Sequence, residues 1–419
     1  MMSVYRTALP WILFTAALLL APKVFTSGTS LTVLSVMGIM IVFALSYNIL
    51  LGQTGLLSFG HAVYYGLAGF VAIHTMNYVI RNKLAIPLPA IPLIGGLAGL
   101  AFGALFGWLS TRRAGTVFSM ISLGLGELVA SSALVLRSFF GGEEGVTANR
   151  AKLEPFFGYK FGPQIEVYYL IAGWCLICII AMYALTRTPF GRMSNAVREN
   201  PERAEFVGYS TQTLRFFAFC FAAFFAGIAG SLAALNFEIM NAQSVGAQQS
   251  GLVLLMTYFG GVGSFIGPII GAIIITLLQV TLSDVTGAWL LYFGLLFILV
   301  VLYSPGGVAG WLALHAPVLK AGLVGKLVPS YTLAAGALAL SFAGAVSIIE
   351  LAHHHLVKAQ GEGTVFHRLS MTIDSASPLP WIIGLILFVA GLVALKLVWP
   401  RVHDAWGDVA GAMKAKVQA

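Results

Sequence analysis

Few residues of this 419-residue chain have the types and spacing that chemistry requires. Cys175 and Cys178 form a C-x-x-C pair, which is typical of a redox dithiol in soluble proteins. The histidine triplet 353–355 offers nitrogen ligands for a metal. The cysteines, however, lie in the apolar run 168–185, where small apolar side chains pack between helices, and adjacent histidines seldom converge on one ion. We therefore predict neither a redox centre nor a metal site, and no cofactor.

The sequence also lacks the loop G-x-x-x-x-G-K-[ST] that holds nucleotide phosphates. The nearest look-alike, GLVGKL at 322–327, has the wrong spacing and no hydroxyl residue after Lys326. We therefore predict that the chain is not an enzyme and that any ATP hydrolysis belongs to a separate subunit. Glu127 alone is placed well inside an apolar run, whereas proton- or sodium-driven carriers mark their route with several charges. A secondary transporter or channel stays an alternative that this scarcity of charge argues against.

The elements that must position any site are membrane helices. Hydrophobic residues make up 59% of the chain and charged residues 9%, whereas soluble domains carry about a quarter charged residues. The apolar runs have the length of ~20 residues that crosses ~30 Å of hydrocarbon as a helix, without the short alternating segments of a barrel. We predict an all-α, polytopic membrane helix bundle of about ten transmembrane helices, in the runs 9–26, 31–51, 60–79, 89–110, 116–136, 166–186, 214–237, 288–304, 331–351 and 380–399.

The stretch 248–283 is too long for one comfortable span and too short for two. It is interrupted by GGVGSFIGP at 260–268, and glycine and proline favour a turn there. Because cytoplasmic loops carry the excess of Lys and Arg, both ends of this stretch should face the same side of the membrane. We predict a folded-back, broken segment at the glycine cluster. The alternative is a tilted pair of short spans joined by a tight loop.

Lysine and arginine also orient the whole bundle and explain the net charge of +8, since these residues lie between the apolar runs. With Arg6 in the cytoplasm, the inside segments include the loop 187–213, Lys320 and Lys326. The two large outside loops are 137–165 and 352–379. The loop 187–213 is the most polar inside segment, and its helix-favouring residues stop at Gly208. It is either a short amphipathic helix that serves as a handle for a partner protein or a loop lying on lipid headgroups.

Four glycine-containing motifs follow one another along the chain. They are NILLGQTGLLSFGHAVYYGLAGF at 48–70, GGEEG at 141–145, PFGRMSNAVRENPERAEFVG at 189–208 with the Ala- and Gly-rich span 219–230, and FGGVGSFIGPIIGA at 259–272. Their content and order resemble the permeases of branched-chain amino acid ABC transporters, in the larger, M-type form. The resemblance covers roughly residues 31–305, and four motifs in order make it specific.

The resemblance implies roles for particular residues. The stretch 192–208 would be the coupling element that docks on the ATPase subunit, through Arg192, Arg198, Glu199, Asn200, Ala204, Glu205 and Gly208. The two glycine-rich elements would line the translocation path, through Gln53, Thr54, Ser58, His61, Tyr64, Gly261, Gly263 and Ser264. Glycine and serine let helix backbones come close and leave carbonyl and amide groups free for a polar solute.

Two titratable residues allow more than one interpretation. His61, at the edge of the third span, is either a polar residue that lines the path or a histidine that packs helices. Glu127 is expected to be buried or nearly so, and it is either the partner of a polar neighbour or a further residue of the translocation path.

We therefore expect residues 1–30 to form an uncleaved first span, residues 31–305 the permease core, and residues 306–419 a C-terminal extension with two further spans. The family implies a permease subunit of an ATP-driven importer in the bacterial inner membrane, which carries branched-chain amino acids or a related small polar solute. Urea, amides or other organic acids are the alternative solutes. The implied partners are a second permease, two ATP-binding subunits, a periplasmic solute-binding protein and membrane lipid, and no nucleic acid.

Overall fold

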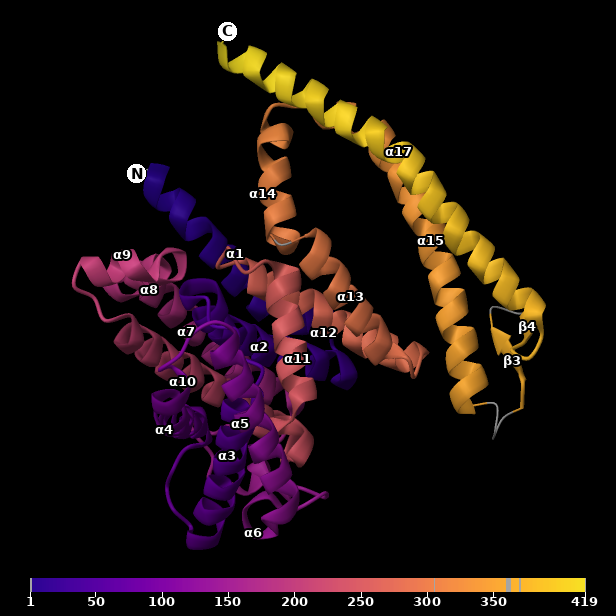
Figure 1. The fold of residues 1–419 in the computed structure, drawn as a ribbon. Helices are drawn as coiled ribbons and strands as arrows, with labels where there is room; N and C mark the ends of the chain where they lie inside the picture. Colours follow the sequence, from indigo (N-terminus) through magenta and orange to yellow (C-terminus); the bar gives the residue numbers. More distant parts are fainter. Residues whose placement is uncertain (1, 305, 359–362, 369–370, 419) are drawn as a thin grey trace. The chain divides into compact units, whose positions relative to one another are not determined.

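The computed structural model describes residues 2–304, 306–358, 363–368 and 371–418. Helices dominate the described residues, which confirms the predicted all-α bundle (Figure 1). The α-helices are α1 (Met2–Val24), α2 (Gly28–Asn48), α3 (Ala62–Asn82), α4 (Ile91–Ser110), α5 (Thr116–Val135), α6 (Arg137–Phe140), α7 (Gln164–Arg187), α8 (Pro189–Glu199), α9 (Pro201–Phe206), α10 (Thr211–Phe237), α11 (Ala247–Gly260), α12 (Gly267–Val285), α13 (Trp289–Tyr303), α14 (Gly307–Lys320), α15 (Val328–His353) and α17 (Pro378–Gln418).

The lengths and apolar content of these helices suit a membrane. Among the described residues, nine helices are long and apolar enough to cross one. The helices α13 and α14 pass the same test together, with a bend of 46° between them, and would make a tenth crossing. This number agrees with the prediction of about ten. The chain is therefore a multi-pass membrane protein.

Two compact units make up the chain. The first consists of Met1–Val280 and Phe297–Gly310, and the second of Thr281–Leu296 and Trp311–Ala419. All four motifs that carry the family resemblance fall in the first unit. The candidate site therefore belongs to the first unit.

The helix α10 is the centre of the first unit. It packs against α2, α3 and α4, and buried residues make up 78% of its most apolar stretch, against 28% for α5. Small residues permit this close approach: a Cβ atom at Gly230 would collide with the carbonyl oxygen of Tyr65, and one at Gly99 with that of Ala223. Because lipid provides no hydrophobic force between helices, such tight packing is what holds a membrane bundle together.

The predicted interruption of the stretch 248–283 is present. α11 ends at Gly260 and α12 begins at Gly267, and a Cβ atom at either glycine would collide with backbone atoms of the other helix. Gly271 lies in the same way against the carbonyl oxygen of Met256. The chain therefore turns at the glycine cluster, a feature that the predicted folded-back segment and the alternative tilted pair of spans share. Gly261 has a φ of +115°, which glycine adopts readily and other residues do not.

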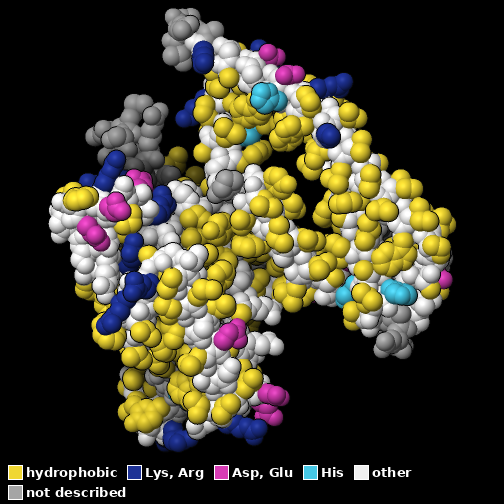
Figure 2. Space-filling model, viewed as in Figure 1, with side chains coloured by type: hydrophobic (Ala, Val, Ile, Leu, Met, Phe, Trp, Pro, Cys, Tyr) yellow, Lys and Arg dark blue, Asp and Glu magenta, His cyan; other side chains and the backbone are white. Residues whose placement is uncertain are grey.

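The two ends of the first unit differ. At the strand end, β1 (Val146–Thr147) pairs antiparallel with β2 (Ile239–Met240) and ties the loop after α6 to the end of α10. At the opposite end, α8 and α9 form a pair of short helices (Figure 1). This end, which holds residues 189–206, is called the handle end. Lys and Arg side chains gather toward both ends, and apolar side chains cover the zone between them (Figure 2). In the predicted orientation the strand end is outside and the handle end is cytoplasmic.

In the second unit, α15 and α17 pack along each other. A Cβ atom at Gly344 would collide with the backbone nitrogen of Phe388, and one at Gly391 with that of Ser341. The hairpin of β3 (Val365–Arg368) and β4 (Met371–Asp374) lies between these helices in the sequence. Three residues from α14, from the connection that follows it and from α17 form a buried apolar cluster, namely Val318, Leu327 and Val409.

Candidate translocation and coupling site

The first glycine-rich element forms a broken end of α2. After Asn48 the helix widens into the π-helical segment η1 (Ile49–Thr54), which ends at Gly55 in a left-handed conformation with a φ of +71°. Residues 55–61 then run without helical structure until α3 begins at Ala62. Non-helical backbone at membrane depth is tolerated only where protein or a water-filled cavity surrounds it. Short π-helical segments gather at functional sites.

Neighbouring side chains hold this non-helical segment. The bonds are Tyr47 Oη to the Ser58 carbonyl oxygen (2.9 Å), Ser119 Oγ to the Leu57 carbonyl oxygen (2.7 Å), and the Phe59 N–H to Ser122 Oγ (3.0 Å). Ser119 and Ser122 come from α5, so the break packs on that helix. Neither serine was predicted from the sequence, since most serines in membrane spans bond only to their own helix. Their spacing of three, which puts them on one helix face, is the only signal in the sequence.

His61 is fully buried beside α2. Its ring packs against those of Phe43 and Tyr47, with centroid distances of 5.5 and 5.2 Å. Ser46 donates its single hydroxyl hydrogen to the Phe43 carbonyl oxygen at 2.7 Å, so His61 Nε2, 3.0 Å from Ser46 Oγ, must be the donor there. The other ring nitrogen, Nδ1, is then an acceptor, and it is buried without a partner. His61 thus packs helices and also keeps a free lone pair.

Four polar atoms in and beside the break are buried without a hydrogen-bond partner. They are Asn48 Oδ1, Gln53 Oε1, Ser58 Oγ and His61 Nδ1. Each unpaired buried group costs about 1–3 kcal/mol, so the break keeps a hydrogen-bonding capacity that folding has not used. Three of these atoms only accept hydrogen bonds, which suits a solute with N–H donors. Gln53, Ser58 and His61 were predicted as path residues from the sequence, and Asn48 was not.

The second glycine-rich element meets the first. A Cβ atom at Gly52 would lie 2.9 Å from the Val262 carbonyl oxygen, and Asn48 Nδ2 donates to the Ser264 carbonyl oxygen at 3.5 Å. Ser264 Oγ also accepts the N–H of Gly267 at 2.9 Å and so caps the start of α12. The two breaks in the helices therefore form one region.

The remaining predicted path residues divide into buried and exposed ones. Thr54 is buried and donates to its own helix, and the buried ring of Tyr64 packs edge-on against Phe219 at 5.2 Å. Gly263 is exposed, and no atom lies within 4 Å of the position that a Cβ atom would occupy. Glu127 is also exposed, and the expectation that it is buried is wrong, because α5 lies at the edge of the first unit.

Capping residues build the helix pair at the handle end. Thr188 accepts an N–H from the first turn of α8 at 3.3 Å, directly before Pro189, and Asn200 accepts one from α9 at 3.0 Å, directly before Pro201. Proline at the first helical position lacks only an N–H that would have no partner in the helix. α9 ends before Gly208, whose φ is +91°. The loop 187–213 thus contains two short helices, as its helix-favouring residues predicted, and its role as a handle for a partner protein stays a prediction.

The predicted coupling residues do not share one surface. Arg192 and Glu199 have exposed side chains, whereas Ala204 is buried. Glu205 Oε1 accepts the hydroxyl of Thr211 at 2.7 Å, which ties α9 to α10. Arg198 turns back toward the bundle, where its Nη1 donates to the Gly52 carbonyl oxygen.

An exposed apolar tip ends the helix pair. Phe206 is 90% exposed and Val207 is 73% exposed, and Tyr209 beyond them is also exposed. These residues were not predicted from the sequence. Two adjacent apolar residues within a charged loop were the available signal.

At the strand end, Arg150 fastens a loop to α10. Its side chain is buried and donates to the carbonyl oxygens of Leu235 (2.7 Å), Asn236 (3.0 Å) and Phe161 (2.9 Å). The backbone N–H of Arg150 donates to Glu238 Oε1 at 2.8 Å. Burial lowers the pKa of the Arg150 guanidinium, and the Glu238 carboxylate opposes that shift. A cation here also suits the negative end of the α10 dipole.

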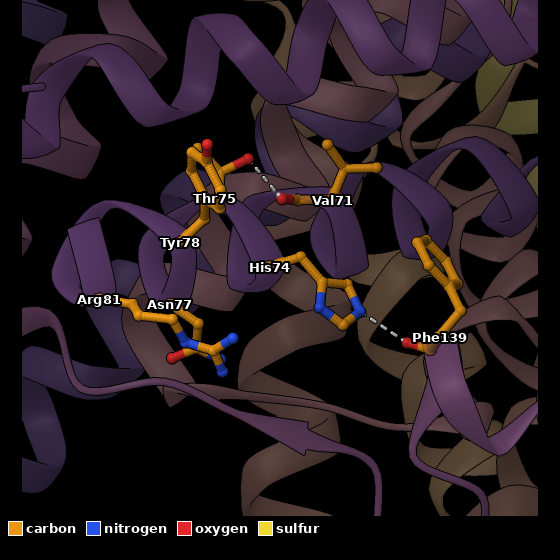
Figure 3. Close-up of a pocket in the computed structure, with 7 residues that line it drawn as sticks. All are labelled: Val71, His74, Thr75, Asn77, Tyr78, Arg81 and Phe139. Carbon is orange, nitrogen blue, oxygen red and sulfur yellow. Dashed lines mark hydrogen bonds between the residues drawn. The ribbon is translucent and has the colours of Figure 1, made fainter. Parts of the chain in front are cut away.

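A cavity of about 530 Å³ lies at the strand end of α3, at the opposite end of this helix from His61 (Figure 3). Its walls are Val71, His74, Thr75, Asn77, Tyr78, Arg81 and Phe139. His74 Nε2 donates to the Phe139 carbonyl oxygen at 2.7 Å, which leaves the other ring nitrogen as an acceptor. The cavity can hold water or a small polar molecule. None of the residues that line it was predicted from the sequence.

Comparison with known proteins agrees with this architecture. Residues 29–304 match the model of the family described as branched-chain amino acid transport system, permease component. The chain is 27% identical over 304 residues to the high-affinity branched-chain amino acid transport system permease protein LivM of Escherichia coli, which covers 67% of this chain and 69% of that protein. No solved structure matches the chain significantly.

Relatives that match a smaller part of the chain carry other names. The chain is 27% identical over 252 residues to the fructose import permease protein FrcC of Rhizobium meliloti, covering 55% of this chain and 67% of that protein. It is 30% identical over 193 residues to the autoinducer 2 import system permease protein LsrC of Yersinia pestis, covering 44% of this chain and 50% of that protein. Since the family model covers more than half of the sequence, the chain belongs to the permease components of the branched-chain amino acid transport family of ABC-type importers.

Proposed function

We propose that this chain forms the translocation path for a branched-chain amino acid, or a related small polar solute, in an ATP-driven importer. The observation that carries the proposal is the group of four unpaired polar atoms at the break after α2. In broken transporter helices, such freed groups serve the solute near the middle of the membrane.

The chemistry of these atoms favours an amino acid. Asn48 Oδ1, Gln53 Oε1 and His61 Nδ1 accept hydrogen bonds and none of them donates. An ammonium group offers three N–H donors to such acceptors. Urea and other amides are the alternative solutes with N–H donors, and organic acids are the alternative without them. The relatives also include permeases named for the import of fructose and of autoinducer 2, so these two solutes are further alternatives to an amino acid.

Energy would reach the path from a separate ATPase subunit docked at the handle end. The exposed tip of Phe206 and Val207 supports this, since large apolar side chains at the end of a polar helix pair are natural anchors for a groove in a partner. Arg192 and Glu199 on α8 would add polar contacts around that anchor.

A second permease would complete the path at α5. Glu127 lies in the middle part of this helix and is exposed, and a carboxylate facing hydrocarbon is costly. A partner subunit or a water-filled path on this face would remove that cost. We further propose two ATPase subunits at the handle end, a periplasmic solute-binding protein at the strand end, and the bacterial inner membrane as the location.

Uptake into proteoliposomes tests the proposal. The complete importer, with binding protein outside and ATP inside, should take up leucine only when the ATPase is present and ATP is supplied. Unlabelled isoleucine and valine should compete, whereas fructose and urea should not. Uptake by the permease alone under an ion gradient would instead identify a secondary transporter. Competition by fructose or urea, with none by valine, would overturn the assigned solute.

A further inference from the structure

The side chain of Arg198 connects the handle end to the break after α2. Arg198 lies in the last turn of α8, and its Nη1 donates to the carbonyl oxygen of Gly52 in η1. The two residues are 146 positions apart in the sequence. The resemblance implies that Arg198 contacts the ATPase, whereas in the structure its charged group points to the bundle.

The Gly52 carbonyl is available because the helix is interrupted. In a continuing α-helix it would accept an N–H four residues later, from Leu56. Leu56 donates instead to the Leu50 carbonyl oxygen at 3.1 Å, since Gly55 has already turned the chain. A guanidinium is a strong donor for such a carbonyl, because a charged donor makes a hydrogen bond about twice as strong as a neutral one.

Two glycines give Arg198 access to this carbonyl. A Cβ atom at Gly55 would lie 3.0 Å from Arg198 Cγ, so the arginine stem covers that glycine. A Cβ atom at Gly52 would collide with Asn48 and come within 2.9 Å of the Val262 carbonyl oxygen. α8, η1 and the second glycine-rich element therefore meet at this point, next to the unpaired polar atoms.

We infer that Arg198 is a positioning residue that latches the break after α2 to the helix pair and transmits movement of α8 to the translocation path. This inference rests on the proposed docking of an ATPase at the handle end. With the latch closed, η1 is held in its interrupted form and its acceptors stay buried. Displacement of α8 by the ATPase pulls on or releases the Gly52 carbonyl and so changes access to Gln53 and His61.

The first test uses the complete importer, purified through its ATPase subunit and placed in proteoliposomes. Arg198→Gln removes the charged donor, and Arg198→Lys keeps the charge with a single donor group. Arg113→Gln is the matched control, because Arg113 is also exposed and follows α4, whose end packs on the handle end of α10 through Gly107 and Phe219.

For Arg198→Gln we expect the ATPase to co-purify at the wild-type level and to hydrolyse ATP, while solute uptake per ATP falls tenfold or more. Arg198→Lys should recover part of this loss, and Arg113→Gln should behave as wild type. Loss of co-purification would overturn the inference, because Arg198 would then be a docking contact. Unchanged uptake per ATP would overturn it as well, because the bond would then be passive.

A second measurement needs no partner subunit. In membranes carrying Gln53→Cys, with the three native cysteines replaced by alanine, a water-soluble maleimide reports access to the break. Addition of Arg198→Gln should raise the labelling rate at least fivefold over Arg113→Gln, and Gly55→Ala should raise it as well by displacing the arginine. Equal rates in all variants would refute the latch. If the wild-type importer shows no ATP-dependent uptake, the proposed function fails, and the labelling still decides whether Arg198 holds the break.

Discussion

At the residue scale, the unpaired acceptor of Gln53 opposes folding, and in the proposed translocation path it is free to bind the solute. Gln53→Met keeps the length of the side chain and removes a buried polar group that costs about 1–3 kcal/mol. We expect the purified variant to melt a few degrees higher than wild type and to take up solute at least tenfold more slowly. Gln248→Met, at an exposed glutamine at the start of α11, should change neither property. A gain in stability with full uptake would show that Gln53 lies outside the path.

In contrast to the unpaired acceptor of Gln53, the hydrogen bonds of the Arg150 side chain stabilise the fold. Arg150→Ala would leave the carbonyl oxygens of Leu235, Asn236 and Phe161 without their charged donor. We expect a loss of about 2–3 kcal/mol in the free energy of unfolding, visible as a lower melting temperature in detergent. Lys152→Ala, at an exposed residue of the same loop, is the control and should melt as wild type does. Equal melting temperatures of the two variants would show that Arg150 does not fasten the loop to α10.

Residue chemistry was predictable only in part. The sequence placed Gln53, Ser58 and His61 in a polar, glycine-rich element, and the structure gathers them at one break. It could not reveal that Arg198 bonds to Gly52, since that contact depends on how α8 folds back on the bundle. Glu127 was misjudged for a related reason. An acidic residue in an apolar run has the same local sequence whether its helix is central or at the edge.

At the element scale, the helix pair α8 and α9 ends in an apolar tip that we assign to docking. Phe206→Asp places a charge where an apolar anchor is needed, and we expect the affinity for the ATPase subunit to fall at least tenfold in pull-down or calorimetry. Phe157→Asp is the matched control, because Phe157 is 86% exposed and lies in the loop between α6 and α7 at the strand end. Undiminished binding of the ATPase subunit by Phe206→Asp would show that the subunit docks on another surface.

The contact between α3 and α10 depends on glycine. Gly230→Ala would push a methyl group into the Tyr65 carbonyl, and overpacking of this kind costs about 1–3 kcal/mol. We expect a lower melting temperature and lower yield. Gly173→Ala on α7 adds the same methyl group where nothing lies within 4 Å, and it should be neutral or slightly stabilising. The difference between the two variants isolates packing from helix propensity.

At the scale of the whole molecule, the two compact units should be separable in function. Gly344→Leu would force α15 away from the backbone of Phe388 and loosen the second unit. We expect faster proteolysis after residue 311 with uptake retained, because the breaks and the helix pair belong to the first unit. Gly336→Leu on the same helix has open space and should resist the protease as wild type does. A parallel loss of uptake would show that the second unit supports the path.

The sequence by itself determined the class of this protein. Apolar runs of membrane length force helices, because every backbone polar group in lipid must be paired within its own segment. Glycine and proline at 260–268 determined where α11 ends and α12 begins, and proline and capping residues determined the start of α8 and α9. These are local effects, which depend on neighbours in the chain.

Only the tertiary structure decided which of these residues act together. Ser122 became a partner of Phe59, Asn48 met Ser264, and Arg198 reached Gly52 because helices distant in sequence pack side by side. The unpaired atoms of the break followed from the same packing, since burial and the lack of a partner are properties of three-dimensional surroundings. Hydrogen bonds and steric contacts act over a few ångströms of space, whatever the separation along the chain, and local sequence cannot specify them.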